Sequence, residues 1–381
     1  MTRRDAFQSL AAFVSASPLL AQQSGPKLEE MVNLFDFEPI FRSHVNKATW
    51  DYVTGGGWDE WTVKRNREAF ERIILRPRYF VKVDSLDVST EVLGQKLAMP
   101  ILVAPTGTHS LVHAEGEVAT ARGAGAAGAV MCVSTSSSFP LEKIAEAARA
   151  PLFFQLYTGP TLEATRQKVE RAVSLGCKAI LVTADGPYQA PRERDKRNRL
   201  EDSPVRRTAR SQRGHTSESG PYGLPLRFQG SLDWSFVDQL CGYAKVPVLV
   251  KGILTAEDAK LAMLHGAAGV VVSNHGGRYL DSAPSTIEVL PEIVDAIGRN
   301  GTVLIDGGIR RGTDVLKALA IGAKAVLIGR PPLWGLGAFG AEGVDRVIRL
   351  LRDELAWAMG LAGRPTIASI DRSLIRIQNQ Y

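Results

Sequence analysis

The segment SNHGGR at residues 273–278 places a histidine and an arginine three residues apart around two glycines. The imidazole of His275 can take a proton near neutral pH, and the guanidinium of Arg278 presents a planar fork of donors that fits a carboxylate. The segment therefore predicts a site that deprotonates a group next to a carboxylate. Two charged residues elsewhere suit this chemistry, because Asp185 could stabilise an imidazolium and Lys251 could stabilise negative charge on an electron-accepting ring.

Two further segments, DGGIRRGTD at residues 306–314 and GRP at residues 329–331, combine glycine with arginine. Glycine lets backbone amides approach a ligand closely, and arginine adds a permanent, bidentate positive charge. The pair therefore predicts a phosphate cradle. A phosphate-binding barrel isomerase without redox chemistry would use the same cradle and is the alternative function.

Regular elements must position these residues, and their pattern is visible in the sequence. From about residue 100 onward, short β-branched or aromatic runs alternate with helical patterns rich in Ala, Glu and Lys. This alternation is typical of βα units with a parallel sheet, and eight such runs close a TIM barrel. We therefore predict an α/β fold, a (β/α)8 barrel whose core spans about residues 100–335. The predicted strands are residues 101–104, 129–134, 152–157, 179–183, 248–251, 269–273, 303–305 and 325–328.

Polar, charged or glycine residues follow every predicted strand. TIM barrels build their active sites from the loops at the carboxyl ends of the strands. A single polar residue there could simply cap a strand, but polar residues at the carboxyl ends of all eight strands indicate a functional surface. The residues concerned are Pro105, Thr106, Ser134, Gln155, Tyr157, Thr183, Asp185, Lys251, Ser273, His275, Asp306, Gly308, Gly329 and Arg330.

An amino-terminal extension precedes the barrel. Its apolar spacing predicts helices at residues 35–45 and 58–72, which we expect to cover the bottom of the barrel or to flank it. Within the barrel we predict helices at residues 116–127 and 256–264, the second preceded by the cap residue Thr255.

The formal net charge is +6 and the isoelectric point is near 9.2. Residues 190–230 hold ten Lys and Arg against five Asp and Glu, so one segment carries most of the excess. It lacks apolar periodicity and has almost no aromatic residues on which bases could stack, which predicts a long, solvated basic loop after the fourth strand. We expect no nucleic-acid partner, although a basic binding protein would use this same loop.

Residues 1–26 contain an arginine pair, a weakly apolar run and small residues. This order is typical of an export signal of the twin-arginine type, and a disordered tail is the alternative. The expected location is accordingly periplasmic or cytoplasmic. No other run of apolar residues approaches the length of a bilayer span, which predicts no transmembrane segment.

The composition, 45% hydrophobic and 23% charged, is that of a globular protein and excludes a disordered or collagenous chain. Three cysteines, none of them in a Cys-x-x-Cys pair, predict neither a disulfide framework nor a thiolate zinc site. We expect reduced, buried thiols and no metal.

The motifs PILVAPTG, FFQLY, LVTADGP, LVKGILTAEDA, GAAGVVVSNHGGRYLD and LIDGGIRRGTDVLKALAIGAKAVLIGRP occur in this order. Over residues 34–375 the sequence resembles the FMN-dependent α-hydroxy acid oxidase and dehydrogenase family, which includes glycolate oxidase, lactate oxidase and the flavin domain of flavocytochrome b2. The resemblance implies one FMN hydroxy acid dehydrogenase domain at residues 27–381 and oxidation of an (S)-2-hydroxy acid to a 2-oxo acid. It also implies a homo-oligomer, a tetramer, and an electron acceptor that is O2 or a quinone or cytochrome.

The resemblance also implies roles for individual residues. His275 would be the base and Asp185 its partner, while Tyr157 would hydrogen-bond the reacting oxygen. The substrate carboxylate would be bound by Tyr52, Arg192 and Arg278. FMN would be bound by Ala104, Pro105, Thr106, Ser134, Gln155, Thr183, Lys251, Ser273, Asp306, Gly308, Arg310, Gly329 and Arg330.

The sequence leaves the order of bond breaking in the substrate open. His275 could take the hydroxyl proton while hydride leaves, or it could take the α-proton first and generate a carbanion. Three residues also depart from the family pattern: Ser136 stands where glycolate oxidases have tryptophan, Gly107 replaces an alanine, and Gln189 replaces a leucine. We expect a larger or differently shaped side-chain pocket, and a roomier cavity near Gly107 with slow reduction of oxygen.

Overall fold

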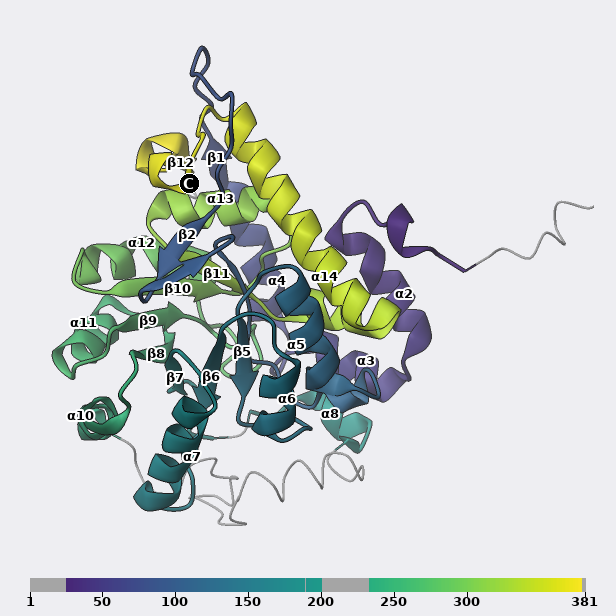
Figure 1. Cartoon of the computed structure of the whole chain (residues 1–381), viewed down its shortest axis with the longest axis vertical. Helices are drawn as coiled ribbons and strands as arrows, with labels where there is room; N and C mark the ends of the chain where they lie inside the picture. The colour runs from purple at the N-terminus through teal and green to yellow at the C-terminus, as the bar shows by residue number, and fades with distance from the viewer. Residues whose placement is uncertain (1–24, 189, 201–232, 379–381) are drawn as a thin grey trace, which may run out of the picture. The chain divides into compact units, whose positions relative to one another are not determined.

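Eight short strands form a closed, parallel β-barrel (Figure 1). The computed structural model describes residues 25–188, 190–200 and 233–378. The strands follow one another around the barrel in chain order, and the last pairs with the first through Val326 and Ile101. They are β4 (Ile101–Val103), β5 (Met131–Ser134), β6 (Leu152–Leu156), β7 (Ile180–Thr183), β8 (Val248–Ile253), β9 (Gly269–Val272), β10 (Thr302–Asp306) and β11 (Ala325–Ile328).

Most of these strands are buried on both faces, as a parallel barrel wrapped in helices requires. The predicted TIM-barrel fold and all eight predicted strands are therefore confirmed. The helices between and after the strands are α5 (Gly116–Ala126), α6 (Leu141–Ala147), α7 (Leu162–Ser174), α8 (Glu193–Arg197), α10 (Trp234–Tyr243), α11 (Ala256–Leu264), α12 (Thr286–Ile297), α13 (Gly312–Ile321) and α14 (Arg330–Leu361).

Local signals fix the ends of several helices. The Thr255 hydroxyl accepts a hydrogen bond from the backbone N–H of Asp258 at 3.2 Å, so the predicted cap of α11 is confirmed. The long helix α14 is interrupted at Phe339 and Gly340, whose backbone angles are not helical. It is two helices in series, and the first begins at Arg330, directly after the last strand.

The amino end of the barrel is closed by a hairpin, β2 (Thr90–Val92) and β3 (Gln95–Leu97). This hairpin ends just before β4 begins. Val92 and Leu97 are buried in the same apolar cluster as the inward side chains of the strands, among them Phe153 and Leu304. The hairpin is therefore a plug of apolar side chains at the bottom of the barrel.

The amino-terminal extension occupies two other places. Helix α2 (Phe37–His44) flanks the barrel, because the Phe37 ring packs edge-on against Phe339 of α14 with centroids 6.0 Å apart. Helices α3 (Lys47–Thr54) and α4 (Trp61–Glu68) lie instead at the carboxyl ends of the strands, where Asn66 donates to the Asn274 side chain at 2.8 Å. Of the two predicted positions, flanking the barrel is therefore found for α2, whereas the bottom is filled by the hairpin and not by the extension.

The chain end returns to the extension, where β12 (Ile375–Ile377) pairs antiparallel with β1 (Ile73–Leu75). Residues 33–381 form one compact unit and residues 1–32 another, of which only residues 25–32, with the 3-10 helix η2 (Leu28–Glu30), are described. The predicted export signal or tail and most of the predicted basic loop lie outside the described residues. In the part of the chain that the structure describes, no helix has the length and apolar character of a membrane span.

Candidate active site

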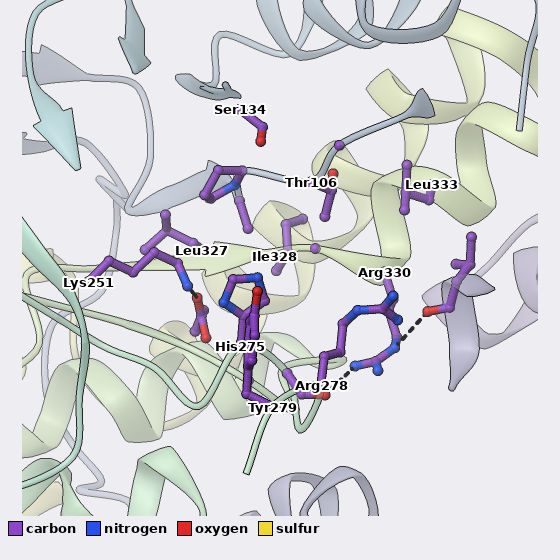
Figure 2. A pocket seen from close by; sticks show the side chains of 18 of the residues that line it. Thr106, Ser134, Lys251, His275, Arg278, Tyr279, Leu327, Ile328, Arg330 and Leu333 are labelled. Atoms are coloured by element: carbon purple, nitrogen blue, oxygen red, sulfur yellow. Dashed lines mark hydrogen bonds and ion pairs between the residues drawn. The ribbon is translucent and has the colours of Figure 1, made fainter. Parts of the chain in front are cut away.

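A cavity opens at the carboxyl ends of the barrel strands (Figure 2), and α3 contributes Tyr52 and Val53 to its wall. Every strand-end loop that the sequence singled out contributes to it or to the layer directly behind it. The predicted residues on its wall are Tyr52, Ala104, Pro105, Thr106, Ser134, Tyr157, Arg192, Lys251, His275, Arg278, Asp306, Gly308, Arg310, Gly329 and Arg330. The functional surface predicted at this end of the barrel is thus a single cavity.

The turn after β9 presents His275 to this cavity. His275, Gly276 and Gly277 all adopt positive φ, at 56°, 65° and 74°, so the chain turns tightly and the histidine sits in a left-handed conformation that few non-glycine residues adopt. Imidazole Nδ1 lies 2.9 Å from a carboxylate oxygen of Asp185. Nε2 lies 3.5 Å from the hydroxyl of Tyr157. His275 and Asp185 are therefore in contact, and the second imidazole nitrogen lies beside a phenol.

Two guanidinium groups lie over the ring of Tyr52. The Arg278 group is 4.9 Å and the Arg192 group 5.6 Å from the ring centroid. Arg278 also donates to the backbone carbonyls of Tyr52 at 2.6 Å and Gly55 at 3.0 Å. Loss of hydration, together with repulsion from Arg192, lowers the pKa of Arg278 to about 9. The site thus concentrates positive charge, and a bound carboxylate would offset the repulsion between the two guanidinium groups.

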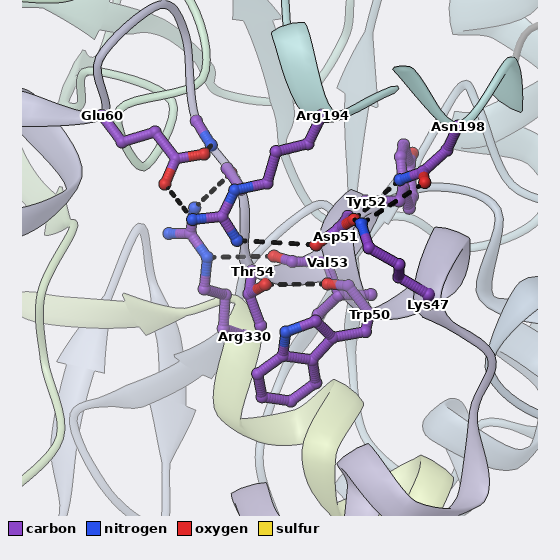
Figure 3. A network of polar contacts seen from close by, with 12 residues as sticks. Lys47, Trp50, Asp51, Tyr52, Val53, Thr54, Glu60, Arg194, Asn198 and Arg330 are labelled. Atoms are coloured by element: carbon purple, nitrogen blue, oxygen red, sulfur yellow. Dashed lines mark hydrogen bonds and ion pairs between the residues drawn. The ribbon is translucent and has the colours of Figure 1, made fainter. Parts of the chain in front are cut away.

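A polar network holds the helix that carries Tyr52 (Figure 3). Asp51 of α3 pairs with Lys47, accepts from Asn198 at 2.7 Å and lies 3.6 Å from Arg194, which also pairs with Glu60. These contacts connect α3 to the segment around α8, on which Arg192 stands. The two arginines of the site are therefore positioned by the extension as well as by the barrel.

Lys251 of β8 is buried in a short chain of polar groups. Its ammonium donates to Ser273 Oγ at 2.6 Å and lies 3.1 Å from Asp306, and Ser273 Oγ in turn donates to Asp306 at 2.9 Å. Burial alone would lower the pKa of Lys251, but the carboxylates of Asp306 and Asp185 outweigh it and the pKa is raised. Lys251 is thus a fixed cation on the cavity wall.

Three of the residues predicted to contact the cofactor stand behind the wall. Gln155 accepts from the Ser134 hydroxyl at 2.9 Å and donates to Thr183 Oγ1 at 2.9 Å, while Ser273 contacts Lys251. Asp185 likewise reaches the cavity through His275. Gln155, Thr183 and Ser273 therefore orient residues of the wall rather than line it.

The other end of the cavity, after β10 and β11, is rich in cations. Loss of hydration lowers the pKa of both Arg310 and Arg330 to about 10, and for Arg330 repulsion from Arg310 adds to it. Gly307 and Gly308 have φ of 101° and 77°, and a side chain on Gly308 would collide with the Asn66 carbonyl. Buried Asp306 Oδ1 accepts no hydrogen bond from the residues that the structure describes. A ligand carrying phosphate and hydroxyl groups, as FMN does, fits these residues.

The space beside Gly107 differs from the prediction. A Cβ atom on residue 107 would lie 2.8 Å from both Cβ and the carbonyl oxygen of Ser136. The same two loops are joined by a hydrogen bond from the Thr108 N–H to Ser136 O at 3.1 Å. Gly107 therefore allows close packing of two loops and does not leave a void, so the expected roomier cavity at this point is wrong. Gln189, the third departure, lies outside the described residues.

Two residues that the sequence predictions did not assign to the site are also present. Tyr279 lines the cavity and packs against His275. His109 is buried and its Nε2 lies 2.7 Å from the Thr106 hydroxyl, which fixes that side chain. The only sequence signal for Tyr279 is the tyrosine in SNHGGRYLD, and His109 had none.

Comparison with known proteins agrees with this geometry. Residues 41–377 match the family model described as FMN-dependent dehydrogenase. The chain belongs to the FMN-dependent dehydrogenase family. The resemblance seen in the sequence is confirmed over nearly the whole domain.

Two curated relatives are similar over almost their full lengths. The chain is 42% identical to peroxisomal (S)-2-hydroxyacid oxidase GLO3 of Arabidopsis thaliana, over 93% of this chain and 98% of that protein. It is 44% identical to an L-lactate oxidase of Nostoc sp., over 91% of this chain and 98% of that protein.

Solved structures of the family superpose closely. Mandelate oxidase with (S)-2-phenylpropionate gives a TM-score of 0.82 at 38% identity, covering 92% of this chain and all of that one. A flavocytochrome b2 variant gives 0.84 at 33% identity, covering 97% and 92%. The chain is thus an oxidoreductase that uses FMN to oxidise 2-hydroxy acids, and the isomerase alternative is not supported.

Proposed function

We propose that His275 is the base in the oxidation of an (S)-2-hydroxy acid to a 2-oxo acid, at the cavity above the barrel. The observation that carries this is the contact of His275 Nδ1 with Asp185 at 2.9 Å, on the same turn that supplies Arg278. A carboxylate at Nδ1 holds the proton on that nitrogen and leaves Nε2 as the basic one. The proton taken from the substrate then rests on Nε2, and Asp185 stabilises the imidazolium.

Arg278 and Arg192 bind the substrate carboxylate. Both guanidinium groups lie over the Tyr52 ring, and repulsion between them contributes to the lowered pKa of Arg278. A carboxylate between them removes that repulsion and accepts charge-assisted hydrogen bonds. The Tyr157 hydroxyl, close to Nε2, hydrogen-bonds the oxygen on C2, so the reacting carbon is fixed between base and clamp.

FMN, when bound, supplies the electron acceptor that protein side chains lack. Gly308, Arg310, Gly329 and Arg330 would hold its phosphate. Asp306 would face its ribityl hydroxyls, with Ser273 orienting Asp306. Lys251 would stabilise negative charge at the pyrimidine edge. Ala104, Pro105, Thr106 and Ser134 would line the ring, with Gln155 and Thr183 orienting Ser134.

Ser136 sets the space for the substrate side chain. It is buried on the cavity wall, and its hydroxyl has no hydrogen-bond partner among the described residues. A serine leaves more room than an indole, so acids with a methyl, a larger or a polar group on C2 are substrates. A Ser136→Trp variant should keep turnover of glycolate and lose that of L-mandelate, as measured by steady-state rates for both acids.

Anaerobic titration tests the whole proposal. The FMN-loaded protein is mixed with glycolate, L-lactate or L-mandelate, and the flavin absorbance is followed. At least one acid should bleach it, and D-lactate should not. A protein that stays oxidised with all three acids would overturn the proposal. The electron acceptor is then assigned by following peroxide, with O2 proposed as an acceptor because several relatives are named oxidases.

A further inference from the structure

Tyr279 touches the histidine on which the chemistry depends. It follows Arg278 in the loop after β9, and its ring meets the His275 imidazole edge-on, with centroids 4.6 Å apart and planes at 80° (Figure 2). This is the geometry of a favourable aromatic pair. Tyr279 also lines the cavity. The contact therefore lies at the reacting end of the site.

The chain makes room for this ring with a glycine next to the partner of the histidine. A Cβ atom on Gly186 would lie 2.6 Å from Cζ, 2.7 Å from Cε1 and 2.9 Å from Oη of Tyr279. Any larger residue at 186 would push the ring from its place. The absence of a side chain at Gly186, the residue after Asp185, thus leaves the space that the Tyr279 ring occupies next to His275.

The backbone of His275 is also held in an unfavourable conformation. Its φ of 56° is in the left-handed region, and the two residues that follow are glycines in the same region. Residues in such conformations keep one orientation only when their surroundings determine it. Both carboxylate oxygens of Asp185 lie near Nδ1, at 2.9 and 3.1 Å, and oppose rotation of the ring about Cβ–Cγ from one side. The Tyr279 ring packs against the imidazole and opposes the same rotation from another side.

We propose that Tyr279 is a positioning residue that holds the plane of the His275 imidazole so that Nε2 faces the C2 substituents of the substrate. The proposal rests on the function of His275 proposed above. Gly186 acts through Tyr279, since it provides the space in which the ring lies.

The test compares Tyr279→Leu with Tyr279→Phe in the FMN-loaded protein. Either route of oxidation breaks the C2–H bond, so anaerobic flavin reduction by L-lactate and by L-lactate deuterated at C2 reports on positioning. Tyr279→Leu should slow reduction by roughly 3- to 10-fold, raise the isotope effect and leave KM nearly unchanged. Tyr279→Phe keeps the ring and should restore most of the rate.

A merely structural role predicts a different result. Partial unfolding would lower the amount of bound flavin but leave the isotope effect and the rate per flavin as in the parent. Equal rates and isotope effects for Tyr279→Leu and the parent would overturn the proposal.

Gly186→Ala disturbs the same contact from the other side. It should slow reduction in the parent and have no further effect in the Tyr279→Leu background, because the ring that it displaces is then absent. Additive losses would mean that Gly186 acts on Asp185 directly and would count against the proposal. The alanine variant also keeps the test available if Tyr279→Leu fails to fold.

His275→Gln separates this inference from the proposed function. Full activity in that variant would remove the base and the positioning role together. Loss of activity in His275→Gln with parental behaviour of Tyr279→Leu would overturn the positioning role alone.

Discussion

The two ends of the barrel are built from the same eight strands but bury different kinds of side chain, apolar at the amino end and charged at the carboxyl end. At the amino end, the β2–β3 hairpin buries Val92 and Leu97, exposed by 1% and 6%, against the interior side chains. At the carboxyl end, Lys251 and Asp306 are buried as a charged pair, and Arg278 and Arg330 have lowered pKa values. Apolar burial stabilises the first end, whereas desolvated charge destabilises the second unless a ligand compensates it.

This contrast shows that buried charges at one end of the barrel can be tolerated because apolar packing at the other end stabilises the fold. TIM barrels place chemistry at one face and stability at the other. Substitutions at the carboxyl end should therefore change rates at nearly constant stability, and substitutions at the amino end should do the reverse. Four variants test this separation.

The largest effect is expected for His275→Gln. Removing the base should lower the rate of flavin reduction by about 10²–10⁴-fold, because positioned acid–base catalysis contributes that much. Stopped-flow reduction by L-lactate measures it. The FMN content and the thermal midpoint should match the parent, and turnover at the parental rate would show that His275 is not the base.

Leu97→Ala should affect stability instead. Truncating a buried leucine leaves a cavity and lowers the free energy of unfolding by about 2–4 kcal/mol. Urea unfolding followed by circular dichroism measures this, while the rate per bound flavin should stay at the parental value. Leu97→Met, which nearly conserves volume, is the matched control and should cost less than about 1.5 kcal/mol. A slow but fully stable Leu97→Ala protein would contradict the separation of the two ends.

Arg278→Lys should produce an intermediate effect on substrate binding. Lysine keeps the charge but loses the fork, so KM for the hydroxy acid should rise by about 10- to 100-fold, in line with the loss of one charge-assisted hydrogen bond. Steady-state kinetics with L-lactate measure it, and the flavin content checks that the site is intact. An unchanged KM would place the carboxylate elsewhere.

The smallest effect is expected for Gly107→Ala, and it marks the limit of the comparison, because this residue lies at the functional end but packs closely against a neighbouring loop. The added methyl meets Ser136, so the loop after β5 must shift, at about 1–2 kcal/mol of unfolding free energy. We also expect a changed ratio of reoxidation by O2 and by a dye acceptor. Parallel stopped-flow reoxidation of the reduced protein measures it. Rapid, stoichiometric peroxide formation by the parent would contradict the slow reaction with oxygen expected from the sequence.

The sequence predicted most of the barrel because its signals are local. Alternating apolar runs located all eight strands, and Thr255 marked the start of α11. Strand order then placed His275, Asp185 and Lys251 at one end, since parallel strands bring their carboxyl ends together.

What the sequence did not predict depends on contacts between distant segments. No local pattern in residues 47–68 indicates that they reach the mouth of the barrel, and only the family resemblance implied it, through Tyr52. Their position follows from partners more than 200 residues away, such as Asn274 and Arg278. The sequence indicates open space at Gly107, because it does not show the approach of Ser136, which is a tertiary contact. The ring of Tyr279 was overlooked for the same reason.

Arg330 connects the end of α3, beside Tyr52, with the turn after β9 that carries His275. Its guanidinium donates to the carbonyls of Val53 and Gly55, beside Tyr52, and to that of Gly276, beside His275, each at 3.0 Å. An anion held by the same side chain would thermodynamically link cofactor loading to order in both segments. The apoprotein should accordingly exchange amide hydrogens of α3 and of the turn after β9 faster than the holoprotein does. The cofactor would then act as the last structural element of the mouth as well as its reagent.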